Sequence, residues 1–159
     1  MFSVPCFLLL IRDWLILAIL VFIFVYDLKY LEVEDLIILS AGAAVIILNL
    51  FLGNNWLNIA IAILIGVGFF GLQYLLTKGK GIGLGDLSIG FFMGAALSNW
   101  RLLLLALFIA YIIGTVISLI LLLQKKKGLK SPLPLAPFLA IGTLVALFWG
   151  QQIINWYLW

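Results

Sequence analysis

The sequence predicts an all-α integral membrane protein with six transmembrane helices. Apolar residues make up 67% of its 159 residues and charged residues only 9%, whereas a soluble domain carries about 25% charged residues. The few charges also gather between long apolar stretches instead of recurring within them. A chain with so little charge lacks the polar side chains to cover a soluble surface, so we expect its apolar stretches to cross a bilayer.

We expect residues 1–13 to form an N-terminal lead-in to the first span. Their apolar run is too short to cross a bilayer alone, and Arg12-Asp13 interrupts it. This lead-in either lies at the membrane interface or is the remnant of a longer N-terminus. Residues 14–159 are expected to form one six-helix membrane domain. Its first span runs from Trp14 to about Tyr30, and a cluster of charges follows the span.

Five further apolar stretches complete the expected domain. The third has 22 residues, close to the roughly 20 that a helix needs to cross a bilayer. The fourth is short, so we expect neighbouring helices to shield it from lipid. Gly66, Gly68 and Gly71 in the third stretch predict close helix packing, since small residues let backbones approach. The five predicted spans cover residues 36–52, 56–77, 86–97, 102–123 and 135 to 149 or beyond.

Lysine and arginine positions predict the orientation, because cytoplasmic loops carry an excess of both. Seven of the nine basic residues fall in one set of connections, namely 27–35, 78–86 and 125–134. Arg12 and Arg101 belong to the other side. Both termini are therefore expected outside the cytoplasm, with Asp27 and Asp86 near the same cytoplasmic face.

The composition excludes several classes of site. Histidine is absent, and Cys6 is the only cysteine. Histidine-based catalysis, histidine metal sites, cysteine zinc sites and a disulfide within one chain are all excluded. We attribute the net charge of +3 to the basic residues that set the membrane orientation, so we expect no nucleic-acid partner. We also expect no metal and no cofactor. Any chemistry depends on carboxylates, lysines and hydroxyls.

The stretch 78–86, with glycines at four alternate positions, ends in Asp86 at the start of an apolar run. Alternating glycines disfavour a regular helix, and an acid at membrane depth is costly unless it faces water or a partner. Asp is also a favoured N-cap residue, so a capping role and a reaction site are both open. Asp27 is a second acid in a similar place.

Two carboxylates near one membrane face are the minimum for aspartyl hydrolysis. Like charges held close cannot both ionise, so the pair shares a proton. The ionised partner takes a proton from water as the water attacks the peptide carbonyl, and the protonated partner polarises that carbonyl. Asp27 and Asp86 are therefore the predicted catalytic pair.

These residues resemble the type IV prepilin peptidases, membrane aspartyl proteases with a GxGD motif. Residues 83–86 (Gly-Leu-Gly-Asp) match that motif, which implies that Gly83 and Gly85 form the active-site loop. Asp27, followed by Asp35 eight residues later, is similar to the family's other aspartate segment. The resemblance implies cleavage of prepilin-like proteins, which carry a short basic leader before a hydrophobic helix. It also implies a multi-pass protein of the inner (plasma) membrane whose active site faces the cytoplasm.

A third segment, residues 133–140, resembles the family's C-terminal Pro-Phe-Gly-Pro-Phe-Leu-Ala stretch. Pro137 and Phe138 are therefore candidates for substrate contact, as is Asp35, for which a solvated turn is the simpler interpretation. Ser88 and Glu34 depart from the family's usual lysine and proline. No segment with two Cys-x-x-Cys pairs is present, so the chain is similar to a peptidase-only form that does not methylate its product.

Two alternatives remain at this stage. Tyr26-Asp27 together with the GxGD motif also resembles presenilin and signal peptide peptidase, whose aspartates lie on neighbouring spans. Here two predicted spans separate the aspartates. The second alternative is a small transporter or assembly subunit whose acids bind ions, since intramembrane acids commonly mark such paths.

Overall fold

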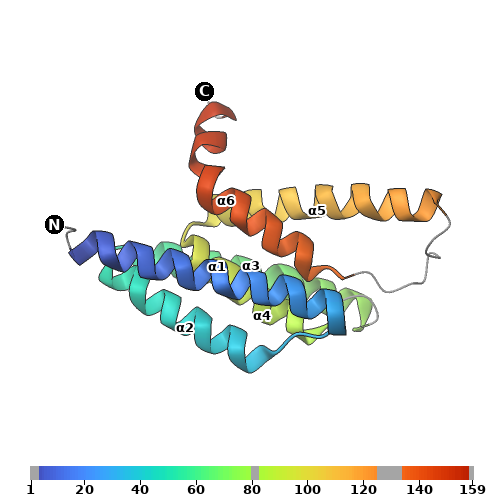
Figure 1. Cartoon of the computed structure of the whole chain (residues 1–159), viewed down its shortest axis with the longest axis horizontal. Coiled ribbons are helices and arrows are strands. Elements are labelled where there is room, and N and C mark those ends of the chain that lie inside the picture. Colours follow the sequence, from blue (N-terminus) through green and yellow to red (C-terminus); the bar gives the residue numbers. More distant parts are fainter. Residues whose placement is uncertain (1–3, 80–82, 125–133, 158–159) are drawn as a thin grey trace.

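In a computed structural model of the chain, the described residues 4–79, 83–124 and 134–157 form six α-helices and no β-strand (Figure 1). The predicted all-α class is confirmed. Four helix ends, at Tyr30, Thr77, Leu97 and Leu123, fall where the sequence predicts them. The helices are α1 (Val4–Tyr30), α2 (Asp35–Phe51), α3 (Trp56–Thr77), α4 (Leu84–Leu97), α5 (Trp100–Leu123) and α6 (Ala136–Tyr157).

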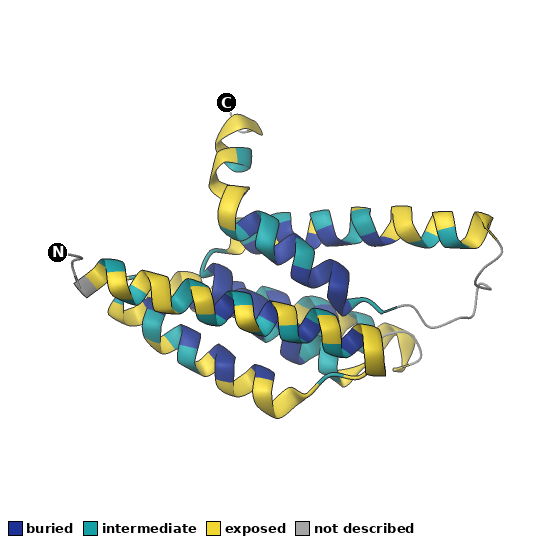
Figure 2. Ribbon diagram, viewed as in Figure 1, coloured by how far each residue is buried: buried dark blue, intermediate teal, exposed yellow. Residues whose placement is uncertain are grey.

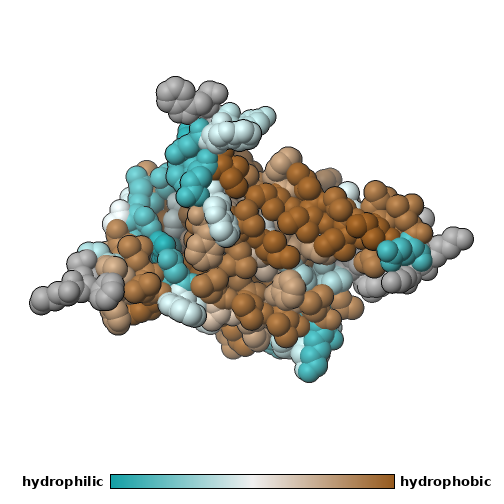
Figure 3. Space-filling view, turned by 45° about the horizontal axis from the view of Figure 1, so that its top comes forward, coloured by the Kyte–Doolittle hydropathy of each residue, from teal (hydrophilic) through white to brown (hydrophobic). Residues whose placement is uncertain are grey.

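Helices α1, α3, α5 and α6 are long and apolar enough to cross a membrane, whereas α2 and α4 are shorter apolar helices. Figure 3 shows a broad hydrophobic face over the middle of the molecule, with hydrophilic patches toward its ends. A soluble protein rarely exposes so large an apolar surface. The chain is therefore consistent with a multi-pass membrane protein.

Helix α1 begins ten residues before the predicted start of the first span, because Arg12 and Asp13 do not interrupt it. The Arg12 Nη2 and Asp13 Oδ1 atoms lie 2.7 Å apart in an ion pair. This pair neutralises both charges and lets the helix continue through them from Val4 to Tyr30.

Helix α4 is the centre of the bundle and packs against α2, α3, α5 and α6. Phe92, Met93 and Ala95 have no exposed surface. The shielding predicted for this short segment is therefore confirmed. Because neighbouring protein surrounds α4, its residues depend on close packing more than those of any other helix.

Glycines bring the backbones of α3 and α4 together at one place. A Cβ atom built on Gly66 would overlap the carbonyl of Gly90, and one built on Gly94 would lie 2.6 Å from the Cα of Ile63. Gly68 and Gly71 have nothing within 4 Å of such an atom. The predicted packing role is therefore confirmed for Gly66 and wrong for Gly68 and Gly71, which lie on faces of α3 that no helix covers.

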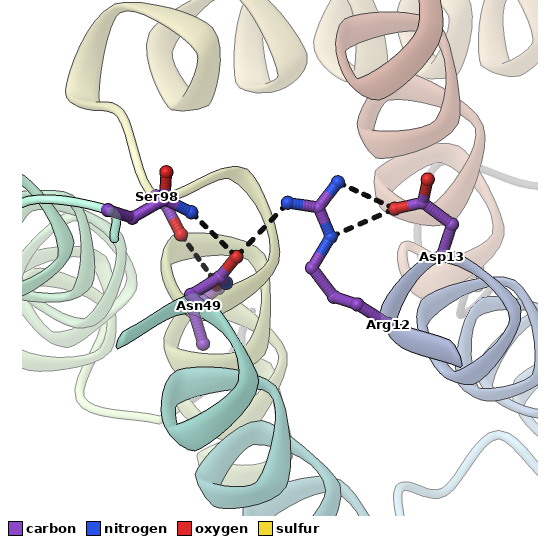
Figure 4. A network of polar contacts seen from close by, with 6 residues as sticks. Arg12, Asp13, Asn49 and Ser98 are labelled. Atoms are coloured by element: carbon purple, nitrogen blue, oxygen red, sulfur yellow. Dashed lines mark hydrogen bonds and ion pairs between the residues drawn. The ribbon is translucent and has the colours of Figure 1, made fainter. Parts of the chain in front are cut away.

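A polar network joins α1, α2 and α4 at the end of the bundle where α1 begins (Figure 4). Arg12 Nη1 donates to Asn49 Oδ1 at 3.2 Å, and the fully buried Asn49 donates through Nδ2 to the Ala95 carbonyl at 2.9 Å. Asn54 and Ser98 add hydrogen bonds of 2.8 and 3.0 Å to the same groups. Among the described residues, every buried side-chain nitrogen or oxygen atom has a hydrogen-bond partner.

Helix α6 begins inside the bundle and ends outside it. Its first turns are buried, whereas its last turns are exposed and turn away from the other helices (Figures 1 and 2). Trp156 and Tyr157 are 84% and 80% exposed. The buried beginning of α6 is the part that shapes the candidate site.

Candidate active site

Asp27 lies in the last turn of α1, and its side chain is held by the first residue of α6. Its carboxylate Oδ2 accepts a hydrogen bond of 3.1 Å from the backbone N–H of Ala136, and the residue is only 7% exposed. The first N–H groups of a helix have no partner within the helix. The Asp27 carboxylate supplies a hydrogen-bond acceptor for the first N–H of α6. This bond fixes the position of the carboxylate, although 109 residues of sequence separate the two groups.

Asp86 is the third residue of α4, and Gly83 is the N-cap residue, with extended backbone (φ −79°, ψ 163°). Asp86 Oδ2 accepts a hydrogen bond of 3.0 Å from the backbone N–H of Gly83. This is the acidic half of a capping box. The expectation that Asp86 itself occupies the N-cap position is therefore wrong by three residues, although its carboxylate does cap the helix.

The end of α1, which carries Asp27, and the start of α4, which carries Asp86, lie at the same end of the bundle, although 59 residues separate the two acids (Figure 1). Asp27 lies close enough to Asp86 for its charge to act on that carboxylate. Helix α6 packs against both α1 and α4, and its first amide binds Asp27. Helix α6 thus links the two helices that carry the acids.

The glycines of the Gly-Leu-Gly-Asp stretch differ in what surrounds them. A Cβ atom built on Gly85 would lie 2.5 Å from Cβ of Val33, whereas nothing comes closer than 3.9 Å to one built on Gly83. Val33 belongs to the connection between α1 and α2. Gly85 therefore allows the connection that follows the Asp27 helix to pack on the first turn of the Asp86 helix. Residues 80–82 of the glycine stretch lie outside the described residues.

The three candidates for substrate contact occupy different positions. Phe138 lies in the first turn of α6 and lines a groove, and Pro137 beside it is buried. Asp35 is the exposed first residue of α2, and within the described part of the chain no hydrogen bond or ion pair joins its side chain to either aspartate. Across the same residues, no three acids or cysteines gather as metal ligands.

Two residues near this site were missed by the sequence analysis. Tyr111 of α5 donates a hydrogen bond of 3.0 Å from its hydroxyl to Oε1 of Gln73 on α3. The charge of Asp86 also acts electrostatically on Tyr111. The signal available in the sequence was a glutamine and a tyrosine within otherwise apolar spans. Polar side chains in such spans commonly join helices or serve function.

Comparison with known families decides which resemblance holds. Residues 14–119 match the Type IV leader peptidase family, a range that covers both aspartates and the Gly-Leu-Gly-Asp stretch. The chain belongs to this family. The presenilin-like interpretation is set aside by this match. No solved structure matches the chain significantly.

Three similar proteins are each named prepilin leader peptidase/N-methyltransferase. The relative from Legionella pneumophila is 33% identical over 164 residues, which cover 99% of this chain and 55% of the relative. Those from Aeromonas salmonicida and Pseudomonas aeruginosa are 36% and 34% identical over 53% and 56% of this chain, and over 28% and 30% of their own lengths. The chain thus spans about half the length of the Legionella pneumophila relative.

Proposed function

We propose that this chain is a membrane aspartyl endopeptidase that removes the short basic leader of type IV prepilin-like proteins. The observation that carries the proposal is that Asp27 and Asp86, from distant segments, lie on the two helix ends that meet at one end of the bundle, beside the start of α6. Each carboxylate is held by a backbone amide, that of Ala136 or Gly83. Membership of a leader peptidase family supports the same reaction.

In the proposed mechanism one aspartate is ionised and the other is protonated. The ionised carboxylate removes a proton from water while the water oxygen bonds to the scissile carbonyl carbon. The protonated carboxyl donates a hydrogen bond to the carbonyl oxygen. When the C–N bond breaks, the leaving amine takes up a proton, and the pair returns to its singly protonated state. Water is the only reactant besides the peptide, and no metal or cofactor takes part.

The proposed topology has six spans, with the termini outside and the aspartates at the cytoplasmic face of the inner (plasma) membrane. Seven of nine basic residues lie in the connections on the aspartate side, as the positive-inside rule requires. At the other end, Arg12 shares a pocket with the turns after α2 and α4. Arg12 and Asp27 are 15 residues apart on α1, or roughly 22 Å at 1.5 Å per residue.

The proposed substrate has a basic leader, and acidic residues lie near the site. Glu32 and Glu34 are exposed in the connection after α1, and Asp35 is exposed at the start of α2. Glu34 also accepts a hydrogen bond of 2.9 Å from the Tyr26 hydroxyl. Opposite charges raise the local concentration of a charged ligand. This connection is therefore placed to attract the leader while the hydrophobic helix stays in the membrane.

The catalytic pair is tested by replacing each acid with its amide. Asp27→Asn and Asp86→Asn should each lower prepilin cleavage by at least 100-fold, because the two acids act as a unit and an amide does not transfer the proton. Asp35→Asn should keep measurable activity and serves as the matched control. Cleavage is followed by gel shift with purified protein in the presence of a chelator, and melting temperature in detergent checks folding.

Wild-type activity in Asp27→Asn or Asp86→Asn would refute the aspartyl mechanism. Loss of wild-type activity to the chelator would refute it as well, and would point to a metal-dependent peptidase.

A further inference from the structure

A hydrogen-bonded pair of polar side chains connects α3 and α5 beside the candidate active site. Tyr111 Oη donates to Gln73 Oε1 at 3.0 Å, and neither side chain is fully buried. The Tyr111 ring also meets Phe69 edge-on, with centroids 5.6 Å apart. Gln73 binds Tyr111 through its oxygen, and its NH₂ group carries two further donors, while a tyrosine hydroxyl both donates and accepts.

Tyr111 also lies at one end of an apolar groove of about 430 Å³ between α5 and the start of α6. Phe138 is on the opposite wall, and its ring lies 3.1 Å from a Cβ built on Gly114, so a larger residue at position 114 would crowd the groove. The lining residues are Tyr111, Gly114, Thr115, Ser118, Leu119, Leu122, Pro134, Leu135 and Phe138.

This groove lies beside the backbone amide that binds Asp27. Its wall includes Leu135, and the next residue, Ala136, donates its N–H to Asp27. Tyr111, on the other wall, lies within reach of the charge of Asp86. A peptide in the groove would therefore run directly to the catalytic pair.

The polar backbone of a peptide is costly to place in an apolar groove unless its groups find hydrogen-bond partners. The bond to be cut must leave any helix to reach the acids, and its neighbouring N–H and C=O groups then need partners where water is scarce. The groove is otherwise lined mainly by apolar side chains. Tyr111 lines the groove and Gln73 is its hydrogen-bond partner, so together they offer both donors and acceptors at this wall.

We infer that the groove holds the hydrophobic segment of the peptide substrate, and that Tyr111 and Gln73 bind its unwound backbone next to the scissile bond. They are positioning residues and transfer no proton. The inference rests on the proposed function, because that function supplies a substrate with a hydrophobic segment directly after the cleavage site.

The placement of the substrate's hydrophobic segment in the groove is tested by disulfide cross-linking, in a variant that does not cleave the substrate. Thr115→Cys lies in the groove, and the control Val116→Cys is 52% exposed on the same helix outside it. Both are made with Cys6→Ser, Asp27→Asn and Asp86→Asn, and are mixed in detergent with a prepilin carrying one cysteine early in its hydrophobic segment. We expect cross-linking through position 115 and at least tenfold less through position 116. Equal cross-linking at both positions, or none at 115, overturns the inference.

The role of the pair is tested by kinetics in the active enzyme. Tyr111→Phe removes only the hydroxyl and Gln73→Leu removes the amide, while Tyr74→Phe is a matched control on α3. When a residue binds the ground state and the transition state of the substrate equally strongly, its removal raises KM and leaves kcat unchanged. We expect KM to rise about tenfold in the first two variants and not in the control, with kcat within twofold of wild type and melting unchanged.

An unchanged KM in Tyr111→Phe and Gln73→Leu overturns the inference, as does a fall in kcat alone. These failures are distinct from failure of the proposed function. If wild-type protein cleaves prepilin and Asp27→Asn does not, the proposed function stands whatever the groove variants show.

Discussion

At the scale of single residues, the candidate site depends on backbone amides as much as on side chains. The Asp27 carboxylate accepts from the first N–H of α6, and the Asp86 carboxylate accepts from the N–H of its own N-cap residue. An N–H at a helix start is a fixed donor, so neither acid needs a charged partner to hold its position. Among the described residues, no lysine or arginine forms an ion pair with either carboxylate.

The two glycines of the Gly-Leu-Gly-Asp stretch should respond differently to substitution. In Gly85→Ala the new methyl group would meet Val33, so the first turn of α4 must shift and carry Asp86 with it. Small displacements of reacting groups lower rates by up to about 100-fold. We expect kcat to fall at least tenfold in Gly85→Ala and to stay within threefold of wild type in Gly83→Ala, whose φ of −79° suits alanine.

The measurement is kcat for prepilin cleavage by the two purified variants. Equal effects of the two substitutions would show that the contact with Val33 does not hold Asp86 in place.

At the scale of the helices, α4 explains why a short segment serves as the centre of the bundle. A helix enclosed by α2, α3, α5 and α6 has little need to match the thickness of the bilayer. Its close contacts come from small residues, including Gly90 against Gly66 and Gly94 against Ile63. In lipid, such close packing replaces the hydrophobic effect as the main force between helices.

The contact between α3 and α4 predicts a difference between two glycines of α3. Gly66→Ala places a methyl group on the Gly90 carbonyl, whereas Gly68→Ala places it in open space. Overpacking a core costs about 1–3 kcal/mol, and alanine is favoured over glycine in a helix by about 1 kcal/mol. We expect Gly66→Ala to lower the thermal melting temperature in detergent and Gly68→Ala to leave it unchanged or raise it.

Similar melting temperatures for the two variants would contradict this packing of α3 against α4.

At the scale of the whole molecule, the two ends of the bundle differ in chemistry. One end carries Asp27, Asp86, Lys29 and Lys78, and the other carries Arg12, Asn49 and the turns that surround them. These ends lie roughly 22 Å apart along α1, from its rise of 1.5 Å per residue. This separation covers most of the roughly 30 Å of the hydrocarbon core, so in the proposed six-span topology the two sets of polar groups would lie toward different faces of the membrane.

The proposed orientation is tested with single cysteines at the two ends in a Cys6→Ser background. Glu32→Cys and Asn58→Cys, both at exposed positions, should label from opposite sides when a membrane-impermeant thiol reagent is added to intact cells. Asn58→Cys should react before lysis and Glu32→Cys only after lysis. Labelling of both from the same side would contradict the six-span topology and the cytoplasmic site.

The sequence by itself determined the all-helical class and most helix ends. Thr77, Leu97 and Leu123 end their helices where predicted, because glycine, asparagine and charged residues interrupt apolar runs locally. It also identified Asp27 and Asp86 as a pair, since acids are scarce in apolar segments and these two share one side of the predicted topology. Their catalytic role stays a prediction.

Tertiary structure decided which side chains and backbones meet. Gly66 contacts α4 and Gly68 does not, although the two lie in the same apolar run. The amide of Ala136 binds Asp27, and Tyr111 binds Gln73, across 109 and 38 residues. Hydropathy and charge depend on sequence neighbours and so predict spans and sides. The rotation and depth of each helix depend on how all six pack together, which no local pattern contains.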